Sequence, residues 1–145
     1  MSRGITLIEV IVTLVVVASL VTVVAINAAR TRERHQLESI AEQVVSLIKT
    51  AQSYSIAAAP VNTAPPPFSV EINSSSTQIK ASDNSTVTQF SLPSGITADS
   101  FNTQFAVRTG EPSSAGSFNL QSSHFELQIN VTRNGQISAN PANPK

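Results

Sequence analysis

A single acidic side chain, Glu9, interrupts an otherwise apolar stretch near the start of the 145-residue chain. An ionisable group in a membrane segment costs roughly 2.5–3.5 kcal/mol at the bilayer centre and less near an end, so such groups usually have a partner or a function. The ordinary alternative is a side chain that extends to the lipid headgroups. Glu9 is therefore the first candidate for chemistry, and that chemistry is charge pairing.

The other chemically capable residues indicate no active site. The sequence has no cysteine, which excludes disulfides, thiolate catalysis and cysteine-ligated metals. Its two histidines, His35 and His124, are both expected on the surface. No carboxylate pair has catalytic spacing, and there is no nucleophile elbow or phosphate-binding glycine loop. We therefore expect no catalytic residue, no metal site and no cofactor, and the protein is not expected to be an enzyme.

The element that positions Glu9 is the apolar run from Ile5 to Ile26. At about 22 residues it is long enough to cross a bilayer as a helix, in which the backbone satisfies its own hydrogen bonds. A cleaved secretory signal is an alternative, because Ala25, Ala28 and Ala29 could form a small-residue cleavage site. The apolar core of such signals is normally about 7–15 residues long, so the length of this run favours a membrane-spanning helix.

A helical pattern continues beyond this run. Between Leu37 and Ile56, apolar residues recur mostly at i, i+3, i+4 and i+7, which is typical of an amphipathic helix. No proline precedes Pro60, and no glycine occurs between Ile5 and Ala59. The sequence therefore predicts one continuous helix that ends near Ala58.

The rest of the chain predicts a β-rich head. Apolar and polar residues alternate in several short segments separated by turn residues, and Asn134-Gly135 is a typical hairpin turn. The predicted strands lie at residues 68–72, 78–80, 86–92, 101–108, 118–120 and 125–131, with a return strand from Ile137. The phenylalanines are expected in the core, and the fold class is expected to be α+β.

The segment Met-Ser-Arg-Gly-Ile-Thr-Leu-Ile-Glu, from Met1 to Glu9, closely resembles the leader and N-terminal signature of type IV pilins and type II secretion pseudopilins. In that family a short basic leader ends in glycine. A membrane-embedded aspartic peptidase cuts after the glycine and methylates the new N-terminal amine. The resemblance implies cleavage between Gly4 and Ile5 and N-methylation of Ile5. It also implies that Glu9 acts in assembly, by pairing with the Ile5 amine of a neighbouring subunit.

The sequence departs from the family pattern at two places. The residue after the cut is usually Phe or Met, whereas here it is Ile5. Many pilins also have a helix-breaking Gly or Pro in the apolar half, where this chain has Ala18 and Ile26. In the head, the order of the Tyr54 segment, Leu92-Pro-Ser-Gly95 and the Asn134-Gly135 hairpin resembles the H-type minor pseudopilin and related minor pilins. A major pilin or another minor subunit stays an alternative.

The resemblance implies a structural, minor subunit of a type IV pilus or type II secretion pseudopilus with a pilin-like fold, in which a long N-terminal helix packs on a small antiparallel β-rich head. The implied regions are a leader at 1–4, a transmembrane assembly helix at 5–26, an amphipathic extension at 27–59, a head at 60–140 and a flexible tail at 141–145. The expected partners are other pilin or pseudopilin subunits, the prepilin peptidase and the inner-membrane assembly machinery. Nucleic acid is expected only if the filament serves DNA uptake.

The implied location is the bacterial inner (cytoplasmic) membrane, crossed once with the head outside the cytoplasm, and then a periplasmic or extracellular filament. Arg30, Arg32 and Arg34 follow the span, so a count of positive charges alone would favour the opposite orientation. The alternative function is a signal-anchored extracytoplasmic protein that binds a ligand such as DNA or a secreted substrate.

Overall fold

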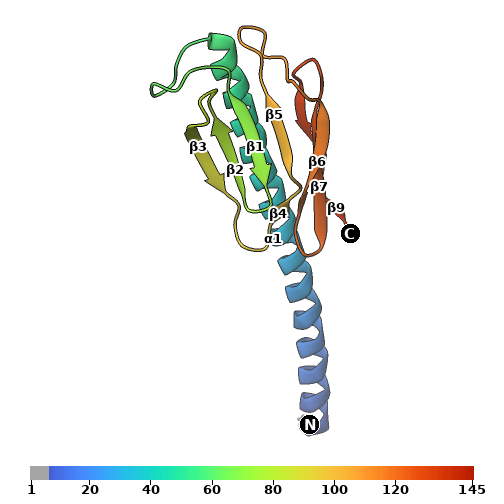
Figure 1. The fold of residues 1–145 in the computed structure, drawn as a ribbon. Helices are drawn as coiled ribbons and strands as arrows, with labels where there is room; N and C mark the ends of the chain where they lie inside the picture. Colours follow the sequence, from blue (N-terminus) through green and yellow to red (C-terminus); the bar gives the residue numbers. More distant parts are fainter. Residues whose placement is uncertain (1–6) are drawn as a thin grey trace. The chain divides into compact units, whose positions relative to one another are not determined.

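The computed structural model describes residues 7–145, apart from the side chains of Val23 and Ile26. Within these residues the chain forms one helix and nine short strands that pair antiparallel (Figure 1). The predicted α+β fold class is therefore confirmed. The chain divides into two compact units, Met1–Glu33 and Arg34–Lys145.

The helix α1 spans Leu7–Ala57, which confirms one continuous helix over the described residues. In the first unit, the apolar side chains that the structure describes are exposed, including Leu7, Leu14 and Val24. By length and composition this helix could cross a membrane, although a signal sequence would meet the same criteria. The helix ends where Ala58 takes a positive φ of 51°, a common way to stop a helix, and Pro60 follows shortly afterwards.

The part of α1 in the second unit buries one stripe. The buried residues recur every three or four positions, so they lie on one face of the helix. They are Leu37, Ile40, Ala41, Val44, Ile48, Ala51 and Ser55. Charged and polar residues such as Glu42, Ser46 and Lys49 occupy the opposite, exposed face.

Two antiparallel sheets pack against this stripe. The first has the strand order β3-β2-β1-β5, and the second has the order β4-β6-β7-β8 with β9 also paired to β7. The strand bounds are β1 Ser69–Asn73, β2 Ser76–Lys80, β3 Thr86–Ser91, β4 Thr97–Ala98, β5 Phe101–Gln104, β6 Gly116–Gln121, β7 Phe125–Val131, β8 Ile137–Ala139 and β9 Asn143–Pro144. Figure 1 shows the two sheets side by side along the helix.

The core forms where the inner faces of both sheets meet the helix. In β7 the alternation holds, since Leu127, Ile129 and Val131 are all buried. Phe101 and Phe118 stack with ring centroids 5.1 Å apart, which joins β5 of one sheet to β6 of the other. The phenylalanines belong to the core as predicted: Phe68, Phe105 and Phe118 are buried, and Phe90, Phe101 and Phe125 are partly buried against them.

Three details of the head differ from the sequence-based expectations. The predicted strand at 101–108 ends at Gln104, because its partner strand β1 begins at Ser69, opposite Gln104. The chain then turns through Arg108 and Gly110, which both have positive φ values of about 70°. The two-residue strand β4 has too little sequence pattern to be foreseen.

The predicted flexible tail at 141–145 is the third difference, because these residues are held to the head. Asn143–Pro144 form β9 beside β7, and Ala142 is buried. The Lys145 backbone N–H donates to the His124 carbonyl at 3.0 Å, and the Lys145 ammonium donates to the Ser122 carbonyl at 2.8 Å. The edge of β7 that β8 leaves unpaired supplies the partners of β9, and residues just before β7 supply those of Lys145.

Candidate functional site

Glu9 lies in the first turn of α1 among exposed apolar side chains. Between Leu7 and Ile26, the hydroxyls of Thr13, Ser19 and Thr22 bond to the helix backbone. Thr13 Oγ1 donates to the Glu9 and Val10 carbonyls at 3.0 and 2.8 Å, and Ser19 Oγ donates to the Val16 carbonyl at 2.7 Å. Such bonds satisfy the hydroxyl groups within the helix, so these groups need no partner from outside it in an apolar environment.

The Glu9 carboxylate differs from these hydroxyls. It has no hydrogen-bond or ion-pair partner among residues 7–145. It is also the only charged side chain between Gly4 and Ala29 in the sequence. In an apolar environment an unpaired carboxylate is costly, and a positive group would remove most of that cost. The segment can therefore receive a cation at one defined height of the helix.

The predicted cleavage and methylation site, Gly4 and Ile5, lies outside the described residues. The geometry around the cut therefore stays a prediction from the sequence. Of the three predicted site residues, the structure places only Glu9, in the helix that the sequence predicts.

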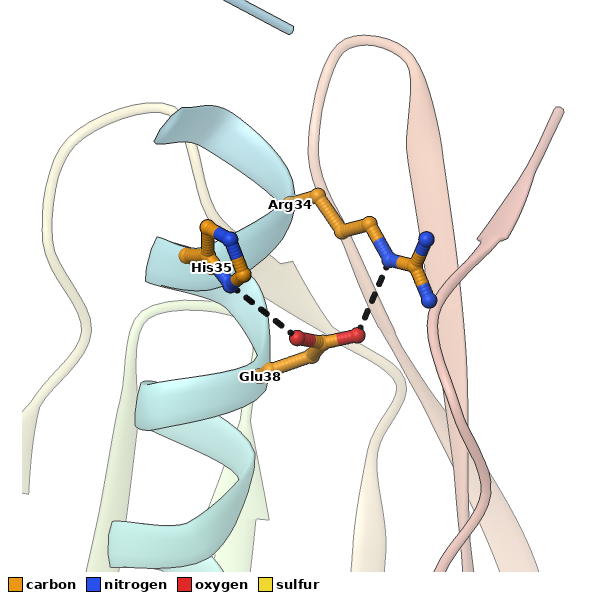
Figure 2. Close-up of polar contacts among 3 residues, drawn as sticks. All are labelled: Arg34, His35 and Glu38. Atoms are coloured by element: carbon orange, nitrogen blue, oxygen red, sulfur yellow. Dashed lines mark hydrogen bonds and ion pairs between the residues drawn. The ribbon is translucent and has the colours of Figure 1, made fainter. Parts of the chain in front are cut away.

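A cluster of three charged or titratable side chains lies where α1 enters the second unit. Arg34 Nε donates to Glu38 Oε1 at 3.0 Å, and His35 Nδ1 lies 3.5 Å from Glu38 Oε2 (Figure 2). The Arg34 guanidinium, by this hydrogen bond, lowers the pKa of Glu38 below its ordinary value, and the Ala142 backbone contributes to the same shift. The spacing of i, i+3 and i+4 places all three side chains on one side of the helix.

This cluster indicates a structural role. Arg34 and His35 are exposed, so their ion pairs with Glu38 stabilise the head only modestly. The contact between Glu38 and Ala142 connects the helix to the tail next to β9. No group of three or more metal-binding side chains occurs in the part of the chain that the structure describes.

Two polar helix residues hold the head together in a way that sequence patterns did not reveal. Ser55 is fully buried, and its hydroxyl accepts a hydrogen bond from the Phe68 N–H at 3.0 Å. Gln52 Nε2 donates to the carbonyls of Gly110 and Gly135, each at 3.0 Å. Ser55 lies four residues after the buried Ala51, so its place on the stripe was available from the sequence. Nothing in the sequence indicated the partners of Gln52.

The comparisons with known proteins give no relative. No family model matches the chain, and no curated protein or solved structure is significantly similar to it. The function must therefore be argued from the residues themselves.

Proposed function

We propose that the protein is a structural, minor subunit of a type IV pilin-like filament, either a pilus or a type II secretion pseudopilus. In this proposal the prepilin peptidase cuts after Gly4 and methylates Ile5. The mature subunit then lies in the inner membrane, with its head outside the cytoplasm, before assembly. It joins the filament through the first half of its helix.

One observation carries the proposal: the Glu9 carboxylate, which has no partner among the described residues, ends the Gly-Ile-Thr-Leu-Ile-Glu signature and lies in the first turn of an apolar helix. Cleavage creates a positive amine at Ile5, four residues before Glu9. The amine of an incoming subunit and the carboxylate of its neighbour neutralise each other. Because the pair fixes one height along the helix, it also sets the axial register between subunits.

The head supports the same proposal. The second half of α1 is part of the core of the head, so the helix and the head fold as parts of the same subunit core. The most apolar window of the helix has no buried share in the described structure. Such a surface needs lipid or other helices as a partner. A membrane pool and a helical filament core provide these in turn.

The N-terminus of the mature protein tests the proposal. Mass spectrometry of the protein from its native membrane is expected to show a chain that starts at Ile5 with a methylated amine. Gly4→Leu is expected to accumulate uncut precursor, because the bulky side chain blocks the peptidase. A mature chain that starts near Thr31 would favour a cleaved signal, and an intact Met1 would favour a simple membrane anchor. Either of these two results rejects the filament proposal.

A further inference from the structure

An open groove runs between the exposed face of α1 and the strand β8, within residues 34–145. Its volume is about 740 Å³. The helix contributes Glu42, Val45 and Lys49 to one wall, and Ile137–Ala139 of β8 form the other. The groove is open, partly apolar and bounded by a strand, features that suit an extended peptide.

The wall formed by β8 is an unpaired sheet edge. The Thr132 N–H donates to the Gln136 carbonyl and the Asn140 N–H donates to the Gln128 carbonyl, both at 2.9 Å. In an antiparallel ladder, hydrogen-bonded and non-bonded pairs alternate. The register of β7 and β8 then turns the backbone groups of Ile137 and Ala139 away from β7. Because β8 is the last strand of its sheet, these groups point to the open edge.

The direction of β8 along the helix follows from two contacts. Gly135, before β8, accepts a hydrogen bond from Gln52 near the end of α1. Ala142, after β8, interacts through its backbone with Glu38, which is about four turns earlier in the helix. The strand β8 therefore runs antiparallel to α1. A strand added antiparallel to β8 would run in the same direction as α1.

The helix wall of the groove carries two opposite charges. Glu42 and Lys49 are exposed, and neither has an ion-pair partner among the described residues. They are seven residues apart, or about 10.5 Å along the helix axis. Residues i and i+4 of a strand share a face and are about 13 Å apart, a separation that long charged side chains can adjust.

We propose that this groove binds an extended segment of another protein, which adds to the edge of β8 by β-strand addition. Given the direction above, the segment has a basic residue against Glu42 and, four residues later, an acidic residue against Lys49. A second copy of this chain does not fit, because none of its described strands has a basic residue followed four positions later by an acid. Backbone hydrogen bonds supply affinity, and the charges supply direction. This proposal does not depend on the filament function.

The charge pattern can be tested with the full chain in detergent micelles and a labelled peptide, acetyl-Thr-Val-Lys-Val-Thr-Val-Glu-Val-Thr-amide, by fluorescence anisotropy. A second peptide with Lys and Glu exchanged is the control. We expect the wild type to bind the first peptide about fivefold more tightly, as two exposed ion pairs allow. The double variant Glu42→Lys/Lys49→Glu should reverse this preference. Equal binding of both peptides by both proteins, or no binding of either, would overturn the proposal.

The strand-addition geometry has its own test. Ala139→Pro removes an N–H that points to the groove, and it should weaken binding at least tenfold, whereas Ser138→Ala should bind as the wild type does. If Ala139→Pro unfolds, hydrogen exchange on the wild type decides instead. Saturating peptide should then slow exchange of the Ile137 and Ala139 amides. Unchanged exchange at both amides contradicts the proposal, and so does peptide-independent dimerisation through this face in sedimentation.

Discussion

The two halves of α1 belong to one continuous helix but differ in burial. The first half exposes its apolar side chains, whereas the second half buries a stripe of them. Leu14, in the first half, is 63% exposed, whereas Leu37, in the second half, is fully buried. The first half is apolar from Leu7 to Ala29, where Glu9 is its single charged residue. The second half is apolar on one face and has charges on the other. A continuous helix can therefore have two different surroundings. The backbone is helical in both halves, and only the pattern of apolar side chains distinguishes them.

The largest expected effect tests the single charge of the first half. Glu9→Gln keeps the shape of the side chain but removes the attraction for the Ile5 amine of a neighbour. Leaving one member of a buried ion pair alone typically costs about 3–5 kcal/mol, so filament incorporation should fall by at least a hundredfold. Insertion and cleavage should be unaffected, because a neutral side chain enters lipid more easily. Quantitative immunoblotting of sheared filaments beside the membrane fraction measures both.

Glu9→Asp is the matched control for this experiment. It keeps the charge and shortens the side chain, so it should retain most of the incorporation that Glu9→Gln loses. If Glu9→Gln incorporates as well as wild type, then Glu9 has no part in assembly and is an ordinary acid at the membrane edge.

The next effect compares one substitution in the two halves. Leu37→Ala removes a fully buried side chain, and such deletions typically cost about 2–5 kcal/mol. Leu14→Ala makes the same chemical change at an exposed position and should leave the stability of the head unchanged. Tyr54, whose ring lies 5.7 Å from that of Phe68, reports head packing by near-ultraviolet circular dichroism during thermal unfolding. Equal melting temperatures for the two variants would show that the stripe has been misassigned.

A smaller effect concerns the polar contacts of the second half. Gln52→Met keeps the length of the side chain but leaves the Gly110 and Gly135 carbonyls without their donor. A lost partner of this kind costs about 1–3 kcal/mol when the group stays buried. Gln43→Met, at an exposed position of the same helix, is the matched control. Urea unfolding of both variants measures the difference, and a loss no greater for Gln52→Met would mean that water replaces the amide.

Sequence patterns predicted much of the fold, because buried residues recur along each element with the period of that element. The stripe of α1 and the alternation in β7 follow directly from 3.6-residue and two-residue periods. The tail could not be predicted, because Asn143–Pro144 has no such period and pairs only where β8 leaves the edge of β7 open. Gln52 was missed for a related reason: its partners are 58 and 83 residues away.

The functional features also differ in how far the sequence could predict them. Glu9 was predictable, because an isolated charge in an apolar run is visible in one dimension. The groove beside β8 was not, because it requires the sheet order and the position of the strand along the helix. A charge that is unusual in its local sequence can be found without a structure, whereas a surface assembled from distant segments cannot.

The smallest effect lies at the junction of the two halves and depends on pH. Arg34 lowers the pKa of Glu38 in the folded protein, with 4.5 as the ordinary value. A carboxyl whose pKa is lower when folded stabilises the protein above its unfolded pKa, and this stabilisation is lost as the pH falls through the folded pKa. The contribution of such a solvent-screened pair is below about 1 kcal/mol. Glu38→Gln should therefore lower the melting temperature slightly at pH 7, and this difference should shrink below pH 4.5.

The measured quantity is the difference in melting temperature between the wild type and Glu38→Gln, because other carboxyls also make the wild type less stable in acid. Lys80 lowers the pKa of Glu71, and hydrogen bonds from Ser85 lower that of Asp83, so the wild type loses stability in acid from several places. These groups are unchanged in Glu38→Gln, and subtracting the two melting curves isolates Glu38. Arg34→Gln should give the same pH-dependent difference, because it removes the other partner of one pair. A difference that stays constant from pH 7 to pH 3 would show that Glu38 acts through its contact with Ala142 and not through its charge.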